Sequence, residues 1–392
     1  MKAVRDRWAF ASLATLLYWV AHQALRPFVA LRLDQLGADA ARVGLAVSLH
    51  ALVPFVLAIP LGRLSDRFGL RRLLLASIVV MAASGALYPL ASAAEQIAVL
   101  EGVNGVGTMG VWICLQSLVT HAGSGETLRR HLALFSLAWG VGLASGPTVG
   151  GLLFDYLGFE VLCAAYAAAA VLTLGAVALV PFRGVGAVAN EARARFTSQM
   201  REILARGPVQ GVLLSSFVML YVQSIRQSFY PLFLEQQGMP VSQIGLLLTV
   251  IGLSSVAVRT VTVWVTRQVG ARAVLVLSSA LSVIGMAATP WLGTWPLLVV
   301  GAVLVGVGQG LNAPVTVELM AAYTMTDERG LGMALRAMAN RLAGIVQPLL
   351  FGALGSAFGL ASGFSTSGVL LAGLTVGVWR ASKEAHGLEE PA

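Results

Sequence analysis

Ionisable side chains stand inside several long apolar stretches of this sequence. His22 and Arg26 lie in the first stretch, Glu101 lies in another, and Arg226 lies in a stretch near the middle of the chain. A charged group at the centre of a bilayer costs roughly 2.5 to 3.5 kcal/mol on insertion scales, so such residues usually face a cavity or a partner. If the stretches cross a membrane, these side chains are candidates for binding a substrate or carrying a proton.

The two arginines occupy similar places, since Arg26 and Arg226 stand 200 residues apart. A guanidinium group stays charged and can grip a carboxylate or phosphate through two hydrogen bonds. Two such groups facing one cavity would suit an organic anion. The alternatives are that each arginine pairs with a carboxylate of the chain, such as Glu101 or Glu318, or extends to the membrane surface.

Polar residues recur at helical spacing beside these charges, which indicates helix faces that line a cavity. The substrate-binding candidates of the first half are His22, Arg26, Glu101, Asn104, Thr108 and Trp112. One face of a single helix is expected to carry Gln223, Arg226, Gln227 and Tyr230. The other candidates of the second half are Gln309, Asn312, Thr316 and Asn340.

Proton coupling needs groups that titrate in the membrane. Glu101, Glu318 and His22 are the candidates, because a carboxyl group or an imidazole can gain and lose a proton. Glu318 is also the expected carboxylate partner of the deep arginines Arg259 and Arg341. A neutral, hydrogen-bonded His22 and a hydrated Glu101 near the end of its stretch are the alternatives.

The composition indicates that these residues lie on membrane-spanning helices. The 392 residues are 57% hydrophobic and only 11% charged, which is too apolar for a soluble protein of this length. Each apolar stretch is long enough to cross roughly 30 Å of hydrocarbon as a helix. The expected spans are residues 8–33, 41–62, 72–93, 96–120, 131–154, 159–181, 208–234, 241–266, 272–292, 295–323, 331–354 and 362–379.

Basic residues fall in every second loop, for example Arg63 and Arg72, then Arg129 and Arg130. By the positive-inside rule these loops and both termini are cytoplasmic. The longest polar stretch divides the chain near its middle. The expected organisation is an N-terminal six-helix bundle (1–181), a cytoplasmic linker (182–207), a C-terminal six-helix bundle (208–381) and a cytoplasmic tail (382–392).

The two halves look like copies of one unit. Gly44, Gly69 and Pro147 each have a matching residue 201 positions later, at Gly245, Gly270 and Pro348. A constant shift over most of each half is difficult to obtain by chance. Two parallel six-helix repeats with a site between them near the bilayer midplane is a recurrent transporter design.

The loop after the second expected span reads Gly62-Arg63-Leu64-Ser65-Asp66-Arg67-Phe68-Gly69-Leu70-Arg71-Arg72. It closely resembles the loop signature of the major facilitator superfamily. The resemblance implies the twelve-helix fold of that family and a gating role for the loop, in which Asp66 and Arg67 latch the outward-open state. Asp66 is also a proton-coupling candidate, and the gating candidates in the loop are Gly62, Asp66, Arg67, Gly69 and Arg71. The alternative is a turn that only sets topology.

The fifth expected span carries glycines at Gly142, Gly146 and Gly150, with Pro147 among them. The glycines share one helix face and permit close helix approach. The segment resembles the motif associated in the superfamily with proton-driven antiporters, which implies efflux and a gating role for Gly146 and Pro147. Helix packing without antiport is the alternative.

These observations predict an all-α membrane protein that works as a proton-coupled efflux antiporter for a small organic or amphipathic molecule. The alternatives are an organic-anion carrier that works by uptake or exchange and, from a different class, a non-transporting membrane receptor or enzyme. No nucleotide-binding loop, metal-ligand cluster or nucleophile triad is visible, so neither an enzyme nor an ATP-driven pump is expected, and no metal or cofactor. The net charge of +8 is not gathered in a nucleic-acid-binding patch. The expected partners are the bilayer of the inner membrane, protons and the substrate, with the protein a monomer.

Overall fold

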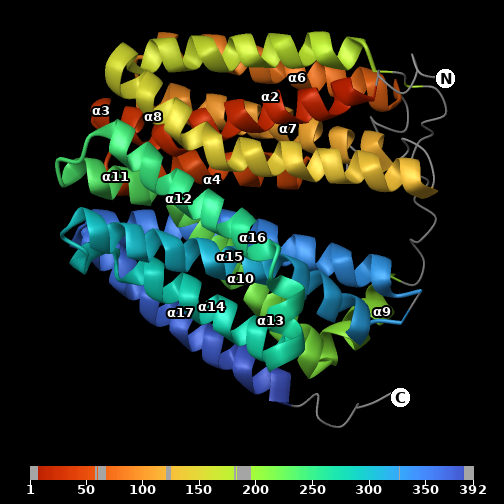
Figure 1. The fold of residues 1–392 in the computed structure, drawn as a ribbon. Coiled ribbons are helices and arrows are strands. Elements are labelled where there is room, and N and C mark those ends of the chain that lie inside the picture. Colours follow the sequence, from red (N-terminus) through yellow and green to blue (C-terminus); the bar gives the residue numbers. More distant parts are fainter. Residues whose placement is uncertain are drawn as a thin grey trace. The chain divides into compact units, whose positions relative to one another are not determined.

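The computed structural model describes residues 8–57, 60, 68–120, 125–180, 182, 196–325 and 327–383, with the backbone alone at 196–199. The regular elements in these ranges are α-helices and short 3-10 helices (Figure 1). The chain forms two compact units, one of residues 1–189 and 227–249 and one of residues 190–226 and 250–392. The bundle boundaries given by the sequence stay a prediction.

The first unit begins with a helix that is interrupted. α2 (Ala9–Leu25) passes through the 3-10 turn η1 (Arg26–Phe28) into α3 (Val29–Gln35). Pro27 favours this interruption, because proline has no N–H group to continue the helical hydrogen bonds. The other helices of this unit are α4 (Ala40–Val56), α6 (Leu70–Leu87), η2 (Tyr88–Leu90), α7 (Ala94–Thr120), α8 (Gly125–Ala178), α11 (Phe229–Gln236) and the part of α12 (Val241–Arg259) up to Thr249.

The second unit contains most of the corresponding elements, but α11 and the start of α12, which correspond to α3 and α4 in the repeat, belong to the first unit. The second unit contains the end of α12 and the helices α9 (Phe196–Ala205), α10 (Gly207–Arg226), α13 (Thr262–Val269), α14 (Ala271–Ala287), η3 (Thr289–Trp291), α15 (Trp295–Tyr323), α16 (Arg329–Phe358) and α17 (Leu360–Lys383). Its core includes Val209 of α10, Val274 of α14 and Val315 of α15, all fully buried. These apolar side chains hold the unit together by burial.

The long helices have the properties of membrane spans. Eight described helices are long and apolar enough to cross a bilayer, or nine if the bent pair α13 and α14 makes one span. Large apolar side chains point outward, such as Val369 (77% exposed) and Phe358 (74% exposed). A surface of this kind suits lipid better than water. The prediction of an all-α membrane protein is confirmed, while the count of twelve spans stays a prediction.

Helix α8 shows why the count depends on how helices are divided. It runs for 54 residues, but Gly158 within it has φ 88° and ψ 169°, which is not helical. A continuous helix of that length would extend roughly 80 Å, more than twice the hydrocarbon thickness. The sequence analysis places the end of one span at 154 and the start of the next at 159, and the break falls between them.

The internal repeat is visible in the backbone. Glycines with positive φ occur in pairs that are 201 residues apart, namely Gly37 and Gly238, Gly69 and Gly270, and Gly158 and Gly359. The turns η2 and η3 also start 201 residues apart, and each has proline as its second residue. The same local geometry at the same spacing supports the predicted duplication.

Two glycines in the first unit let helices come unusually close together. A Cβ atom at Gly105 of α7 would collide with the carbonyl oxygen of His50 in α4. A Cβ atom at Gly146 of α8 would lie 2.6 Å from Cβ of Gln23 in α2. Only glycine fits at these contacts, and the first of them brings α4 against α7 beside Glu101.

Candidate functional site

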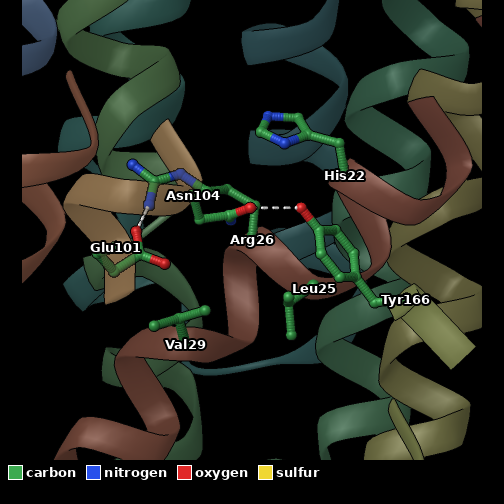
Figure 2. A pocket seen from close by; sticks show the side chains of 7 residues that line it. All are labelled: His22, Leu25, Arg26, Val29, Glu101, Asn104 and Tyr166. Carbon is green, nitrogen blue, oxygen red and sulfur yellow. Dashed lines mark hydrogen bonds and ion pairs between the residues drawn. The ribbon is translucent and has the colours of Figure 1, made fainter. Parts of the chain in front are cut away.

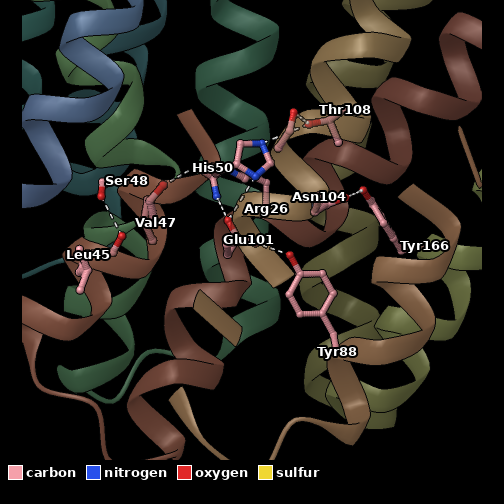
Figure 3. A network of polar contacts seen from close by, with 11 residues as sticks. Arg26, Leu45, Val47, Ser48, His50, Tyr88, Glu101, Asn104, Thr108 and Tyr166 are labelled. Atoms are coloured by element: carbon pink, nitrogen blue, oxygen red, sulfur yellow. Dashed lines mark hydrogen bonds and ion pairs between the residues drawn. The ribbon is translucent and has the colours of Figure 1, made fainter. Parts of the chain in front are cut away.

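Glu101 lies at the centre of a buried polar network in the first unit (Figure 3). Its carboxylate forms an ion pair with the guanidinium of Arg26, and the hydroxyl of Tyr88 donates to its Oε1 over 2.5 Å. Nδ1 of His50 lies 3.3 Å from its Oε2. Glu101 is fully buried and Arg26 is 9% exposed, so both charges are removed from water and depend on each other.

Three local features of the sequence bring these groups together. Arg26 stands at the break between α2 and α3, where it also donates to the backbone oxygen of Val47 at 3.4 Å. Tyr88 begins the turn η2 at the end of α6. Gly105 allows α4 to approach α7, which places His50 beside the carboxylate.

The network continues from His50 along α7. Nε2 of His50 lies 3.3 Å from Oγ1 of Thr108, and the hydroxyl of Tyr18 donates to the backbone oxygen of Thr108 at 2.9 Å. The ring of His22 lies 5.8 Å from the ring of His50 and is stacked on Tyr18. Two imidazoles therefore lie near the carboxylate, His50 in contact with it and His22 on the far side of His50.

A small pocket adjoins Arg26 and Glu101, and the hydroxyl of Tyr166 donates to Oδ1 of Asn104 across it at 2.8 Å (Figure 2). Its lining consists of His22, Leu25, Arg26, Val29, Glu101, Asn104 and Tyr166. The side chains fill it and leave no space of the size of a water molecule. In this arrangement the first unit satisfies its buried charges internally.

Trp112, the last of the predicted substrate-binding residues on α7, belongs to a cluster of aromatic rings. The ring of Trp112 lies 5.0 Å from that of Trp19, 5.8 Å from that of Trp139 and 5.7 Å from that of Phe135. Trp19 also packs edge-on against His22 at 5.7 Å. The group links α2, α7 and α8, and one of its edges touches the histidines of the network.

The predicted row around Arg226 is not a single helix face. α10 ends at Arg226 and α11 begins at Phe229, so Gln227 and Tyr230 do not continue the helix of Gln223. The expectation of one regular helix is wrong here because the backbone of Ser228 leaves the helical region, with φ −140° and ψ −77°. Gln227 donates to Gln23 at 3.1 Å, and Tyr230 is 3% exposed.

The second unit has its own polar contacts. Nδ2 of Asn312 donates to the hydroxyls of Ser215 at 2.7 Å and Ser278 at 3.1 Å. Thr316 accepts a hydrogen bond from Arg336 at 3.1 Å. Other polar atoms are buried without a hydrogen bond to any described residue: Nε2 of Gln309, Oδ1 of Asn340 and Nε of Arg226.

Glu318 does not have the expected partner. Its side chain is exposed on α15, and none of the ion pairs among the described residues includes it. The prediction that it neutralises Arg259 or Arg341 is wrong, because the helix turns this carboxylate away from the packed interior. Its proton-coupling role stays a prediction.

The gating candidates are only partly described. Gly62, Asp66 and Arg67 lie outside the described residues. Gly69 has φ 79°, and the Arg71 guanidinium lies 5.6 Å from the ring centre of Phe182.

The close approach predicted for the glycine segment of α8 is confirmed. A Cβ atom at Gly142 would lie 2.5 Å from that of Trp19 in α2, and Gly146 makes a similar contact with Gln23. Pro147 is buried within the helix. A gating role for Gly146 and Pro147 stays a prediction.

Some residues of the network are absent from the predicted site. His50, Tyr88 and Tyr166 all contact predicted residues directly. Each lies inside an apolar stretch, where a polar group needs a partner. That is the signal by which they could have been found.

A family model described as Major Facilitator Superfamily matches residues 11–240 and 212–391. The chain belongs to the major facilitator superfamily. It is therefore a multi-pass membrane transporter, as the loop signature and composition predict.

Curated relatives and solved structures agree with this membership. The chain is 28% identical to the class C tetracycline resistance protein of Escherichia coli over 335 residues, which are 80% of each chain. It is 23% identical to the class H protein of Pasteurella multocida over 323 residues, which are 80% of this chain and 79% of the relative. A bacterial homolog of the human lysosomal transporter Spinster, inward-facing and unoccupied, has the same fold, with a TM-score of 0.80 and 14% identity over the whole of both chains.

Proposed function

We propose that this transporter exports a small organic molecule in exchange for protons and that Glu101 carries the proton. The observation behind the proposal is that one fully buried carboxylate is shared by Arg26 and His50 inside the membrane-spanning region. Structural interactions alone do not require such a group, because a buried ion pair contributes little net stability. Ionisable groups inside a bilayer are kept mainly for function.

A proton on Glu101 would change the network in a defined way. The carboxylate would become a neutral acid, and the Arg26 guanidinium would lose its counter-charge. Loss of one partner of a buried pair costs about 3 to 5 kcal/mol, so the protonated network favours a different arrangement of α2 and α7. The histidines supply a route by which the proton can reach or leave the carboxylate. Protonation and conformation are coupled by this competition between a proton and an arginine.

Export is favoured over uptake by two observations. The relatives that match 80% of this chain are tetracycline resistance proteins, and a shorter match is named a multidrug resistance efflux pump homolog. The segment from Gly142 to Gly151 resembles the antiporter motif of the superfamily, and its glycines Gly142, Gly146 and Gly150 pack directly against α2, the helix that leads to Arg26. We place the protein in the inner membrane as a monomer with both termini in the cytoplasm.

An organic-anion carrier that binds its substrate with both Arg26 and Arg226 is less well supported than an exporter. Arg26 is neutralised by Glu101 within its own unit. Arg226 has no such partner among the described residues.

Transport into proteoliposomes tests the proposal. Radiolabelled tetracycline is the first probe, because relatives carry its name. We expect accumulation in vesicles with an acidic interior, and we expect a protonophore to abolish it. Accumulation that does not depend on the pH gradient would contradict proton coupling. Failure to take up tetracycline or any of a panel of lipophilic drugs would contradict drug export.

A further inference from the structure

Among the residues that the structure describes, Arg226 is a buried cation without a counter-charge. It is the last residue of α10 and is only 2% exposed. Its Nε has no hydrogen bond, and no described side chain forms an ion pair with its guanidinium. A guanidinium does not lose its proton in a protein, and burial of an unpaired charge is costly. The second unit therefore holds a strong donor group that lacks an acceptor.

Comparison of the two repeats indicates which group is missing beside Arg226. Arg26 and Arg226 each lie at the end of a long helix and three residues before a short helix, α3 or α11, although the 201-residue shift itself pairs Arg26 with Gln227. In the first unit the acceptor is Glu101 of α7. The residue 201 positions after Glu101 is Ala302 of α15, which is 2% exposed and carries no polar atom. The second repeat keeps the arginine and lacks the carboxylate.

A buried hydroxyl without an acceptor among the described residues stands at the position that corresponds to Tyr88 in the repeat. Tyr88 donates to Glu101 from the first position of η2. Thr289 is 201 residues later, at the first position of η3, and is likewise followed by proline. Its side chain is 3% exposed, and its hydroxyl is buried without a hydrogen bond to any described residue. A buried, unsatisfied hydroxyl costs about 1 to 3 kcal/mol.

The helix packed against α10 shows the same deficiency. α16 contacts α10 and carries Gln347, which is fully buried. Neither polar atom of its side-chain amide has a hydrogen-bond partner among the described residues. Buried polar groups are normally satisfied, so the unsatisfied guanidinium, hydroxyl and amide of this unit are candidates to bind a polar ligand.

We propose that Arg226 and Thr289 bind the anionic group of the transported molecule, a carboxylate, phosphate, sulfonate or ionised enol such as that of tetracycline, in the position that the Glu101 carboxylate has in the first repeat. This assignment rests on the proposed transport function and specifies its substrate class. One half of the protein would thus use its own carboxylate as a proton carrier, and the other half would receive a carboxylate or similar group from the substrate. Each repeat contains one cation and one anion in the loaded state.

Binding of a matched pair of probes to the purified full-length protein tests this inference without a pH gradient. The probes are 1-naphthoate and 1-naphthalenemethanol, which share a ring system and differ in charge. We expect Arg226→Gln to weaken naphthoate binding at least tenfold, equivalent to about 1.4 kcal/mol, and to leave the neutral alcohol unchanged. The substitution removes an unpaired buried charge, so it should not impair folding.

The sharper variant is Ala302→Glu, which gives the second repeat the carboxylate of the first. We expect the new side chain to pair with Arg226, to raise the apparent Tm without ligand, and to abolish naphthoate binding. Ala357→Glu is the matched control, because Ala357 is exposed near the end of α16. Thr289→Val should weaken naphthoate binding by a smaller factor.

Three results would overturn the assignment. The first is unchanged naphthoate binding in both Arg226→Gln and Ala302→Glu. The second is equal loss of both probes. The third is Arg226-dependent binding of phosphatidylglycerol that displaces naphthoate, which would assign the site to a lipid headgroup. If the protein moves no protons in vesicles but binds naphthoate as expected, only the proton-exchange mechanism is contradicted. If it moves protons but naphthoate binding does not depend on Arg226, only the anion site is contradicted.

Discussion

Arg26 and Glu101 are 75 residues apart in the sequence and meet as a buried ion pair within one unit. The pair makes the arginine unavailable to a substrate as long as the carboxylate is charged. It also means that any event that neutralises Glu101 releases Arg26.

Glu101→Gln should lower the apparent Tm, by the equivalent of about 3 to 5 kcal/mol, because it leaves the buried Arg26 guanidinium without a counter-charge. Thermal unfolding of the purified protein measures the change. The double variant Glu101→Gln with Arg26→Gln should recover much of the loss, since it removes both charges. A double variant that is as unstable as the sum of the single variants would contradict an ion pair in the folded protein.

Gly105→Ala should destabilise the protein and separate His50 from Glu101, because the added Cβ atom would collide with the His50 carbonyl oxygen. The matched control is Gly175→Ala in α8, where no atom lies within 4 Å of the added Cβ. Alanine there should be neutral or stabilising by up to about 1 kcal/mol. Thermal unfolding of both variants decides the question, and equal stability of the two would show that α4 and α7 are not held so closely.

Acid should weaken an ion pair of the second unit that lies outside the spans. Arg206 contacts Glu328 through two hydrogen bonds of 2.7 and 2.9 Å, and the backbone N–H of Met325 donates to the same carboxylate. The hydrogen bonds from Arg206 lower the pKa of Glu328 below its usual value of 4.5. The pair therefore stabilises the folded state fully above about pH 4.5, and the contribution is lost as the pH falls through the lower folded value.

Comparison of Glu328→Gln with the wild-type protein checks this. The variant should have a lower apparent Tm at pH 7, and the difference should shrink on acidification below pH 4.5. Glu202→Gln is the control, since Glu202 is 70% exposed and lies 3.6 Å from the same arginine. Its effect should be small at every pH. A Glu328→Gln difference that does not change with pH would rule out a titrating pair.

The sequence was sufficient for much of the fold and for part of the site. Hydropathy, the loop signature and the constant shift between halves predict the membrane fold and the repeat. The arginines were found because charge is rare in apolar stretches, and the pairing of Arg26 with Glu101 is one of the alternatives that the sequence left open. Choosing between these alternatives requires knowing which helices are in contact, and the periodicity of residues along one helix does not give that information.

Other parts of the site depend on contacts between distant segments. The approach of His50 to Glu101 depends on Gly105, a residue that is not polar and gives no chemical signal. Pro27 stands directly after Arg26 at the first break, and Pro231, which cannot donate to the carbonyl of Gln227, stands four residues after the second break begins, so both breaks had a proline signal in the sequence. Glu318 was expected to face the arginines because of its type, but the side of α15 on which it lies is set by packing.

Proton counting in vesicles separates Glu101 from the other carboxylates of the chain. The measurement follows internal pH with pyranine while tetracycline crosses the membrane, and compares Glu101→Gln with Glu95→Gln, a carboxylate 73% exposed on the same helix. We predict that the wild-type protein and Glu95→Gln move protons with the drug, and that Glu101→Gln still exchanges drug across the membrane but moves no protons. Proton movement by Glu101→Gln at the wild-type ratio would contradict the assignment of the proton to this residue.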